Sequence, residues 1–311
     1  MAALLSSAMA TPIAIIINDA AGSDTTAEAR ARIAEAFHNL GAEAHFLVAS
    51  SGEEIVDLAR RAAAGDAGPV VAAGGDGTIN AVASVLIETD RTLGVLPLGT
   101  LNHFAKDLNI PLDLGDAVHA ILGGTVAQVD VGEVNGRFFL NNSGLGLYPM
   151  IVRHRERLQE RLGHGKWPAF LWAALSVLRR YPFLVVRVNA DDHESVRRTP
   201  FVFIGNNEYE IAGFEIGTRK RLDAGRLCLY MARRTGRLRL LRFALRALAG
   251  KLRNEKDFDA LCTEEVYIET KRRRVHVAID GEVNVMPTPL HYRVRPGALR
   301  VLVPAAETAE Q

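Results

Sequence analysis

The sequence has few cysteines and no long apolar run. Its 311 residues include two cysteines, Cys228 and Cys262, which do not have the spacing of a metal site. Because two cysteines are too few for a disulfide scaffold, we expect none, and this composition fits a reducing cytosol. The longest apolar-rich stretch, residues 167–178, has about half the length needed to cross a bilayer. The opening segment, MAALLSSAMATP, lacks the basic region of a signal peptide. We expect neither a secretory signal nor a transmembrane segment.

Positive charge is scarce in the first half of the chain. Residues 1–150 contain 7 Lys and Arg against 17 Asp and Glu, whereas residues 151–311 contain 30 against 19. The net charge of +1 therefore hides an acidic half joined to a basic half. A basic half of this kind is expected to meet an anionic partner, such as a membrane surface or nucleic acid. Nucleic acid is the weaker candidate, because no aromatics are interleaved with the basic residues and no known nucleic-acid module is visible.

Apolar runs alternate with helical patterns over the first 125 residues. We predict strands at residues 13–17, 44–48, 69–73 and 93–96, and helices at residues 27–40, 52–64 and 79–87. This alternation is typical of a doubly wound α/β domain, in which helices cover both faces of a parallel sheet. Ligands of such sheets bind at the carboxyl ends of the strands.

After about residue 126 the pattern changes to short strand-like runs, which predict a mostly antiparallel, β-rich second domain. Three helical stretches interrupt these runs, at residues 149–162, 167–181 and 238–252. We place the first domain at residues 1–127 and the second at residues 128–290.

A glycine-rich loop, Gly74-Gly75-Asp76-Gly77-Thr78, directly follows a predicted buried strand. Glycine allows the backbone to approach a ligand closely, and successive N–H groups at a helix start form an anion site. A nucleotide phosphate is the natural occupant. Asp76 would then bind Mg²⁺ through water or accept a proton from an attacking hydroxyl. The loop is neither a Walker A sequence nor a dinucleotide-binding fingerprint.

A second Gly-Thr turn follows the next predicted strand and reads PLGTLN from residue 97. Asn18 and Asp19 follow the first strand. Because all three loops lie at carboxyl ends of neighbouring strands, we expect them to converge on one crevice.

These motifs resemble those of a known family. The segments GGDGT, PLGTLN-x-FA, NNSG at residues 141–144 and DGE at residues 280–282 occur in this order in the diacylglycerol kinase catalytic-domain family. That family includes bacterial soluble lipid kinases, sphingosine kinases and ceramide kinases, and is distantly related to NAD kinases. The resemblance covers nearly the whole chain and is closest to the bacterial lipid-kinase branch.

The resemblance implies a two-domain lipid kinase. An α/β nucleotide-binding domain would be followed by a β-sandwich domain for the lipid substrate, with the tail at residues 291–311 returning to the first domain. It implies ATP and Mg²⁺ as cofactors, a diacylglycerol-like or sphingoid substrate, and a cytoplasmic location at the inner face of an anionic membrane. A homodimer is compatible with the sequence.

Matching positions give the residues implied to act. Those implied to hold the nucleotide are Asn18, Ser50 or Ser51, Gly74, Gly75, Asp76, Gly77, Thr78, Ile79, Asn80, Gly99 and Thr100. Glu282 matches the proposed catalytic base of the bacterial branch, whereas the sphingosine-kinase branch favours the residue equivalent to Asp76. Both carboxylates would reach the same cleft, and the sequence does not choose between them.

Three positions depart from the family pattern. Asp19 stands where the family usually has proline, and His103 where aspartate is commoner. Ala224 stands where bacterial relatives have an aspartate ligand for a structural Mg²⁺, so this ion would require Asp223 as a substitute.

Two stretches are candidates for membrane contact. Residues 238–252 predict a basic amphipathic helix with leucines on one face and arginines on another, and residues 167–178 carry aromatics. Packing against the protein is the competing explanation for both. Arg272, Arg273 and Arg274 are interpreted as a charged turn between strands.

Two other functions stay open from the sequence. One is a soluble-metabolite kinase similar to NAD kinases, in which Asn207 and Glu208 would bind the acceptor. The other is a non-catalytic nucleotide or lipid sensor, suggested by Asp19, His103 and Ala224.

Overall fold

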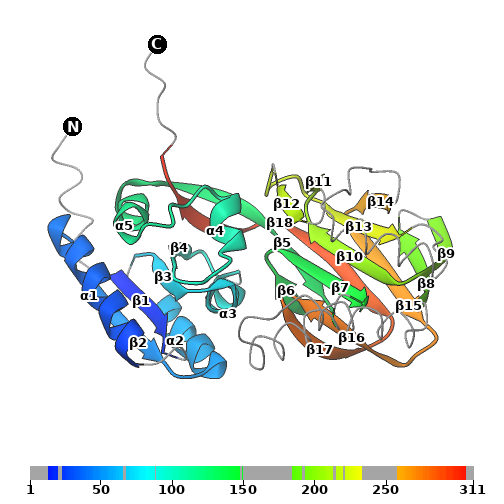
Figure 1. Ribbon diagram of the computed structural model, residues 1–311, viewed down its shortest axis with the longest axis horizontal. Coiled ribbons are helices and arrows are strands. Elements are labelled where there is room, and N and C mark those ends of the chain that lie inside the picture. The colour runs from blue at the N-terminus through cyan, green and yellow to red at the C-terminus, as the bar shows by residue number, and fades with distance from the viewer. Residues whose placement is uncertain are drawn as a thin grey trace, which may run out of the picture. The chain divides into compact units, whose positions relative to one another are not determined.

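The structure, a computed structural model, describes most of the chain (Figure 1). The described residues are 13–19, 23–65, 68–87, 89–147, 149, 184–190, 193–212, 215–219, 221–232 and 258–305. They fall into two compact units. Unit 1 comprises Met1–Asp130 and Gly297–Gln311, and unit 2 comprises Val131–Pro296. The chain passes between the units within two strands, β5 (Thr125–Val134) and β18 (Leu290–Val303). Apart from residue 149, the three predicted helices at 149–162, 167–181 and 238–252 lie outside the described residues.

Unit 1 is built on a parallel sheet. Its own strands are β1 (Ile13–Asn18), β2 (Ala44–Ala49), β3 (Val70–Gly74) and β4 (Thr92–Pro97), in the order β2-β1-β3-β4. The C-terminal part of β18 extends this sheet, since Arg300 and Val301 pair in parallel with Thr92 and Leu93. The inner strands β1 and β3 are almost wholly buried, which explains their uninterrupted apolar sequences.

In the described part of unit 1, three helices connect the strands β1 to β4, and two more lie between β4 and β5. They are α1 (Ser23–Asn39), α2 (Gly52–Ala64), α3 (Asp76–Leu86), α4 (His103–Asp107) and α5 (Leu114–Gly123). The chain reverses direction across the sheet after β2, so right-handed crossovers place α1 on one face and α2 with α3 on the other. The contacts of α2 with α3, and of α1 with α5, agree with this arrangement. The prediction of a doubly wound α/β fold is confirmed.

Unit 2 is a mostly antiparallel β-sandwich. One sheet has the order β14-β13-β10-β7-β16-β17, and the other contains the N-terminal part of β18, then β15, β8 and β9, with β5 and β6 beside β18. A separate hairpin pairs β11 with β12. The bounds are β6 (Arg137–Phe139), β7 (Asn142–Gly146), β8 (Leu184–Ala190), β9 (His193–Thr199), β10 (Phe201–Asn206), β11 (Tyr209–Ala212), β12 (Glu215–Arg219), β13 (Leu227–Ala232), β14 (Phe258–Thr263), β15 (Glu265–Thr270), β16 (Arg274–Ile279) and β17 (Glu282–Pro287).

The core of unit 2 lies between its two sheets. The six-stranded sheet contributes buried residues such as Leu145 and Val277, and the facing sheet contributes Ile268 and Tyr292. Along β15 the buried and exposed residues alternate, as expected for a sheet that packs on one face and meets solvent on the other. The prediction of an antiparallel sandwich is confirmed.

A buried carboxylate joins the strands β5 and β18 within unit 2. The side chain of Glu133 is 7% exposed and accepts hydrogen bonds from Arg293, at 2.8 and 2.9 Å, and from Arg295, at 2.7 Å. Burial alone would raise the pKa of Glu133, but these bonds and charges outweigh it and lower the pKa.

The two cysteines form a disulfide, so the expectation drawn from their number is wrong. Cys228 in β13 and Cys262 in β14 lie directly opposite each other in the antiparallel register, with their Cα atoms 4.1 Å apart. Strand pairing brings together two residues 34 positions apart in the chain. The cysteine content therefore no longer supports a reducing compartment.

No helix within the described residues is long and apolar enough to cross a membrane.

Candidate functional site

The first glycine loop joins β3 to α3. Gly74 ends the strand, Gly75 is extended and precedes the helix, and Asp76 is the first helical residue. The helix therefore starts earlier than the predicted residue 79, and Asp76, Gly77 and Thr78 form its first turn. The N–H groups of this turn have no acceptor within the helix, and Gly75 supplies no side-chain cap. The turn can therefore bind an anion through its backbone.

The second glycine loop touches the first, backbone to backbone. Pro97 is in register with Gly74, and the N–H of Leu98 donates to the carbonyl of Gly74 at 3.0 Å. A Cβ atom on Gly99 would lie 2.6 Å from the Cα of Gly75, a separation that real Cβ contacts do not reach. The predicted convergence of the two loops is what the structure shows, and only glycine at position 99 allows this approach.

Asn102 fixes the shape of the second loop. Its backbone is left-handed, with φ 49°, a conformation that asparagine tolerates better than most residues. Its side chain accepts from the N–H of Gly99 at 3.0 Å and donates to the carbonyl of Gly99 at 2.7 Å. Thr100, between them, is exposed.

Asp76 joins the two loops through α4. Its carboxylate oxygens accept from the N–H groups of His103 and Phe104, each at 3.3 Å. Residue 103 therefore contacts Asp76 through its backbone, which histidine supplies as well as aspartate. The departure from the family pattern at His103 leaves this contact intact.

The residues after β1 and β2 lie at the same carboxyl edge of the sheet. Asn18 ends β1, which neighbours β3. The hydroxyl of Ser51 caps α2 by accepting from the N–H of Glu54 at 3.2 Å. Ser50 donates to the Glu54 carboxylate from both its N–H, at 2.8 Å, and its hydroxyl, at 2.7 Å, and these bonds lower the pKa of Glu54. Both candidate serines therefore also stabilise the first turn of α2 through Glu54.

Two acceptors near this edge lack partners. Asp19 Oδ1 and Asn80 Oδ1 are buried and accept no hydrogen bond from any described residue. Oxygen acceptors of this kind suit a group that donates hydrogen bonds or carries positive charge, such as hydrated Mg²⁺. No group of three or more His, Cys, Asp or Glu residues that could itself hold a metal occurs in the described part of the chain.

In unit 2, the DGE motif forms a tight hairpin turn. Asp280 and Gly281 connect β16 to β17 with φ angles of 44° and 90°, which is the pattern of the Asp-Gly type I′ turn. Glu282 is the first residue of β17 and is exposed. Its carboxylate has no hydrogen bond or ion pair with any described residue, so it is available to a ligand.

The carboxylate of Asp280 holds the NNSG segment. It accepts from the N–H groups of Leu140 at 2.7 Å and of Asn141 and Asn142 at 2.9 Å each. Burial raises the pKa of Asp280 to about 6, although these bonds and the charge of Arg219 act in the opposite direction. Glu282 lies on the β16–β17 hairpin. Asp280 therefore attaches this hairpin to the chain segment at the start of β7.

Arg219, at the end of β12, is a buried cation that sequence reasoning did not select. It is 4% exposed and donates to the carbonyls of Leu140 at 2.7 Å and Asn206 at 3.0 Å, and to Asn141 Oδ1 at 2.9 Å. Its guanidinium also lies over the ring of Tyr209, 5.4 Å from the centroid. One side chain thus joins three segments around the DGE turn.

Contacts within the protein hold the turn around Ala224, where bacterial relatives have the aspartate that binds a metal. The carboxylate of Asp223 accepts from Arg221 at 3.0 and 3.3 Å, which lowers its pKa. Asn207 is fully buried, and its Oδ1 accepts from the N–H of Ala224 at 3.1 Å. Asn207 thus holds the turn at Ala224, and the carboxylate of Asp223 is paired with Arg221 at the surface.

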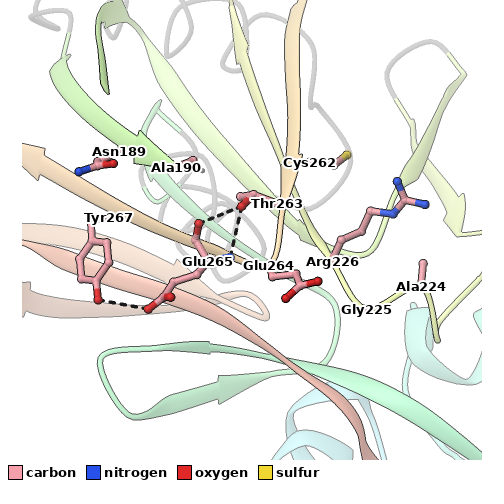
Figure 2. A pocket seen from close by; sticks show the side chains of 10 residues that line it. All are labelled: Asn189, Ala190, Ala224, Gly225, Arg226, Cys262, Thr263, Glu264, Glu265 and Tyr267. Atoms are coloured by element: carbon pink, nitrogen blue, oxygen red, sulfur yellow. Dashed lines mark hydrogen bonds between the residues drawn. The ribbon is translucent and has the colours of Figure 1, made fainter. Parts of the chain in front are cut away.

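A cavity of about 740 Å³ lies elsewhere in unit 2, and Figure 2 shows the side chains around it. The β14–β15 turn, including Thr263 and Glu265, and the segment Ala224 to Arg226 form its walls. No residue assigned to catalysis or nucleotide binding from the sequence lines this cavity. The residues of the candidate site therefore lie on the loops described above and not around this cavity.

Comparison with known proteins gives a consistent result. The diacylglycerol kinase catalytic domain matches residues 12–134, and the YegS C-terminal NAD kinase beta sandwich-like domain matches residues 151–303. A diacylglycerol kinase of Bacillus subtilis is 27% identical over 276 residues, which cover 87% of this chain and 88% of that protein. A protein of Pseudomonas aeruginosa named "Probable lipid kinase YegS-like" is 31% identical over 243 residues, 76% of each chain.

The fold has close counterparts among solved structures. A crystal structure of a diacylglycerol kinase from Bacillus anthracis strain Sterne matches with a TM-score of 0.70 at 21% identity, covering 94% of this chain and 98% of that one. At this identity the likeness shows a common fold over the matched part of the chain.

Proposed function

Because the chain belongs to the diacylglycerol kinase catalytic-domain family, we propose that it transfers the γ-phosphate of ATP to the hydroxyl of a diacylglycerol-like or sphingoid lipid. The observation that carries this proposal is the backbone contact between the two glycine loops. It creates, at one edge of the sheet, a helix start whose N–H groups are open to phosphate.

Phosphate binding in unit 1 rests on the backbone. Residues 1–150 carry a net charge of −10, so a cluster of lysines does not hold the nucleotide. The N–H groups of Asp76, Gly77 and Thr78 would bind phosphate oxygens, and Asn18 and Ser50 would contact the nucleotide from the neighbouring loops. Mg²⁺ carried with ATP would neutralise phosphate charge, and the unpartnered oxygens of Asp19 and Asn80 suit its hydration shell.

We assign the general base to Glu282. In the reaction the lipid hydroxyl oxygen bonds to the γ-phosphorus, its proton passes to the carboxylate, and the bond from γ-phosphorus to the bridging oxygen breaks with its electron pair leaving on ADP. Glu282 is exposed and unengaged, whereas both carboxylate oxygens of Asp76 already accept backbone N–H groups. Asp76 would position the phosphate loops.

A soluble-metabolite kinase is the second candidate. In that case Asn207 would bind the acceptor ribose. Its side-chain oxygen instead holds the turn at Ala224, and the side chain is fully buried, which favours the lipid kinase.

Transfer of ³²P from [γ-³²P]ATP separates these functions. The wild type should label diacylglycerol or sphingosine in mixed micelles and should not label NAD. Glu282→Gln should lower kcat by about 10²–10⁴-fold with ATP binding unchanged, whereas Asp76→Asn should weaken ATP binding as well. Glu264→Gln, at another exposed carboxylate of unit 2, is the matched control.

Each outcome has a clear meaning. Absence of labelled lipid with the wild type would remove the lipid-kinase proposal, and label in NAD would support the second candidate. Normal activity of Glu282→Gln would return the role of base to Asp76.

A further inference from the structure

Four consecutive cationic residues form the connection from β15 to β16, including the first residue of β16, and can be followed between those labels in Figure 1. The basic turn consists of Lys271, Arg272, Arg273 and Arg274, and all four residues are exposed. None of their side chains forms a hydrogen bond or ion pair with a described residue. Four adjacent positive charges without an internal counter-ion suit an anionic partner.

The backbone of the basic turn is fixed even though its side chains are free. The hydroxyl of Thr288 donates to the carbonyl of Arg272 at 2.7 Å, and the N–H of Thr288 donates to the carbonyl of Arg273 at 3.1 Å. Thr270 adds two further hydrogen bonds to Arg272, at 3.1 and 3.2 Å. Because the backbone is already ordered, binding costs little additional backbone entropy.

An apolar strip adjoins the basic turn along β17, the edge strand of the six-stranded sheet. Arg274 pairs across the strands with Pro287, and His276 pairs with Val285, which is 53% exposed. From residue 283 to residue 289 the chain contains no acidic residue. Cationic side chains beside exposed apolar ones are the combination that binds the interface of an anionic bilayer.

The same edge also carries the proposed base. The basic turn ends at the first residue of β16, and the Asp280-Gly281 turn follows the last, so the length of β16 separates the two turns by about 20 Å. A membrane in contact with the β17 edge would therefore meet the basic turn at one end and Glu282 at the other.

We propose that the basic turn and the β17 edge form the surface that docks this protein on anionic phospholipid membranes. This inference rests on the proposed function for its choice of partner, since a kinase of lipid hydroxyls must meet its substrate at a bilayer. Membrane binding is nevertheless measurable without any phosphoryl transfer, so the two proposals can fail separately.

Co-sedimentation with vesicles tests the docking surface. The wild type should bind vesicles containing 30% phosphatidylglycerol, bind pure phosphatidylcholine vesicles far less, and lose binding as salt rises from 50 to 500 mM. Each cation near an anionic surface contributes about a fivefold factor to partitioning. The triple variant R272A/R273A/R274A should therefore bind the anionic vesicles about 100-fold more weakly than the wild type.

Two further variants serve as controls. One tests whether the positive charge of the turn is what matters, and the other tests whether any loss of three positive charges has the same effect. R272K/R273K/R274K keeps the charge and should bind like the wild type. R32A/R61A/R197A removes the same charge from exposed arginines elsewhere and should bind within about threefold of the wild type. Thermal unfolding of R272A/R273A/R274A and R272K/R273K/R274K should match the wild type, because the altered side chains form no hydrogen bond or ion pair with a described residue.

Several results would overturn the docking surface. The proposal fails if R272A/R273A/R274A binds anionic vesicles as tightly as the wild type does. It also fails if the wild type binds neutral and anionic vesicles equally, or binds neither. Loss of RNA binding by R272A/R273A/R274A in a gel-shift assay, with vesicle binding unchanged, would assign the turn to nucleic acid instead. Phosphorylation of a short-chain, water-soluble diacylglycerol by the wild type and the triple variant alike would show that the kinase site is independent of docking.

Discussion

Replacing Arg219 tests whether the buried network around the DGE turn depends on its charge. The variant Arg219→Met keeps much of the apolar volume but removes every hydrogen bond that the guanidinium donates. It would leave the carbonyls of Leu140 and Asn206 and the amide oxygen of Asn141 without this donor. A buried acceptor left without its partner costs about 1–3 kcal/mol, and three acceptors lose this donor, so we expect a loss of about 3–5 kcal/mol.

The matched control is Arg221→Met, two residues further on. Arg221 is exposed and pairs with the exposed Asp223, so its removal should change the free energy of unfolding by less than about 0.5 kcal/mol. Urea unfolding followed by circular dichroism at pH 8 measures both variants. Arg219→Lys should be intermediate, because an ammonium group cannot reproduce the planar fork that reaches three acceptors.

The pH dependence adds a second test of the same network. Asp280 has a folded-state pKa of about 6, above its unfolded value, so the folded state binds the extra proton and stability falls as pH rises from about 4 to about 6. Without the charge of Arg219 the folded pKa rises further, and the decline should continue above pH 6. The deficit of Arg219→Met should therefore be larger at pH 8 than at pH 5.5. A variant as stable as the wild type at both pH values would refute the reasoning.

Three shorter predictions concern other parts of the chain. Gly99→Ala must separate the glycine loops and should lower kcat/KM about 100-fold, while Gly123→Ala, whose new Cβ meets nothing within 4 Å, should not. Ser51→Ala removes the cap of α2 and should lower the free energy of unfolding by about 1 kcal/mol in urea titrations. Replacing Cys228 and Cys262 by serine should cost about 2–4 kcal/mol, and alkylation of the denatured, unreduced wild type should find no free thiol.

Local patterns were sufficient to predict the four strands β1 to β4 and the helices α1 to α3 of unit 1, but not α4, α5 or the pairing of β18 with β4. Buried parallel strands leave continuous apolar runs, and the rule that ligands bind at strand ends predicts that the glycine loops lie together. What periodicity could not supply was the exact start of α3, because the glycines read as a loop although Asp76 to Thr78 already form a helical turn.

The buried network of unit 2 was beyond sequence reasoning. Asp280 binds backbone groups about 140 positions earlier in the chain, and backbone donors leave no signature in the side chains of Leu140 or Asn142. Arg219 lies in a short basic run and reads as a solvated residue. The disulfide was missed for a similar reason, since the register of β13 against β14 is a tertiary property.

The path of β18 has a consequence for synthesis on the ribosome. The edge of the unit 1 sheet at β4 is covered by Arg300 and Val301, which are translated after all of unit 2. Until they emerge, β4 presents an unpaired backbone edge of the kind that invites wrong partners. Unit 1 is thus started first and finished last, so a stalled or prematurely ended nascent chain leaves an incomplete sheet rather than a finished domain.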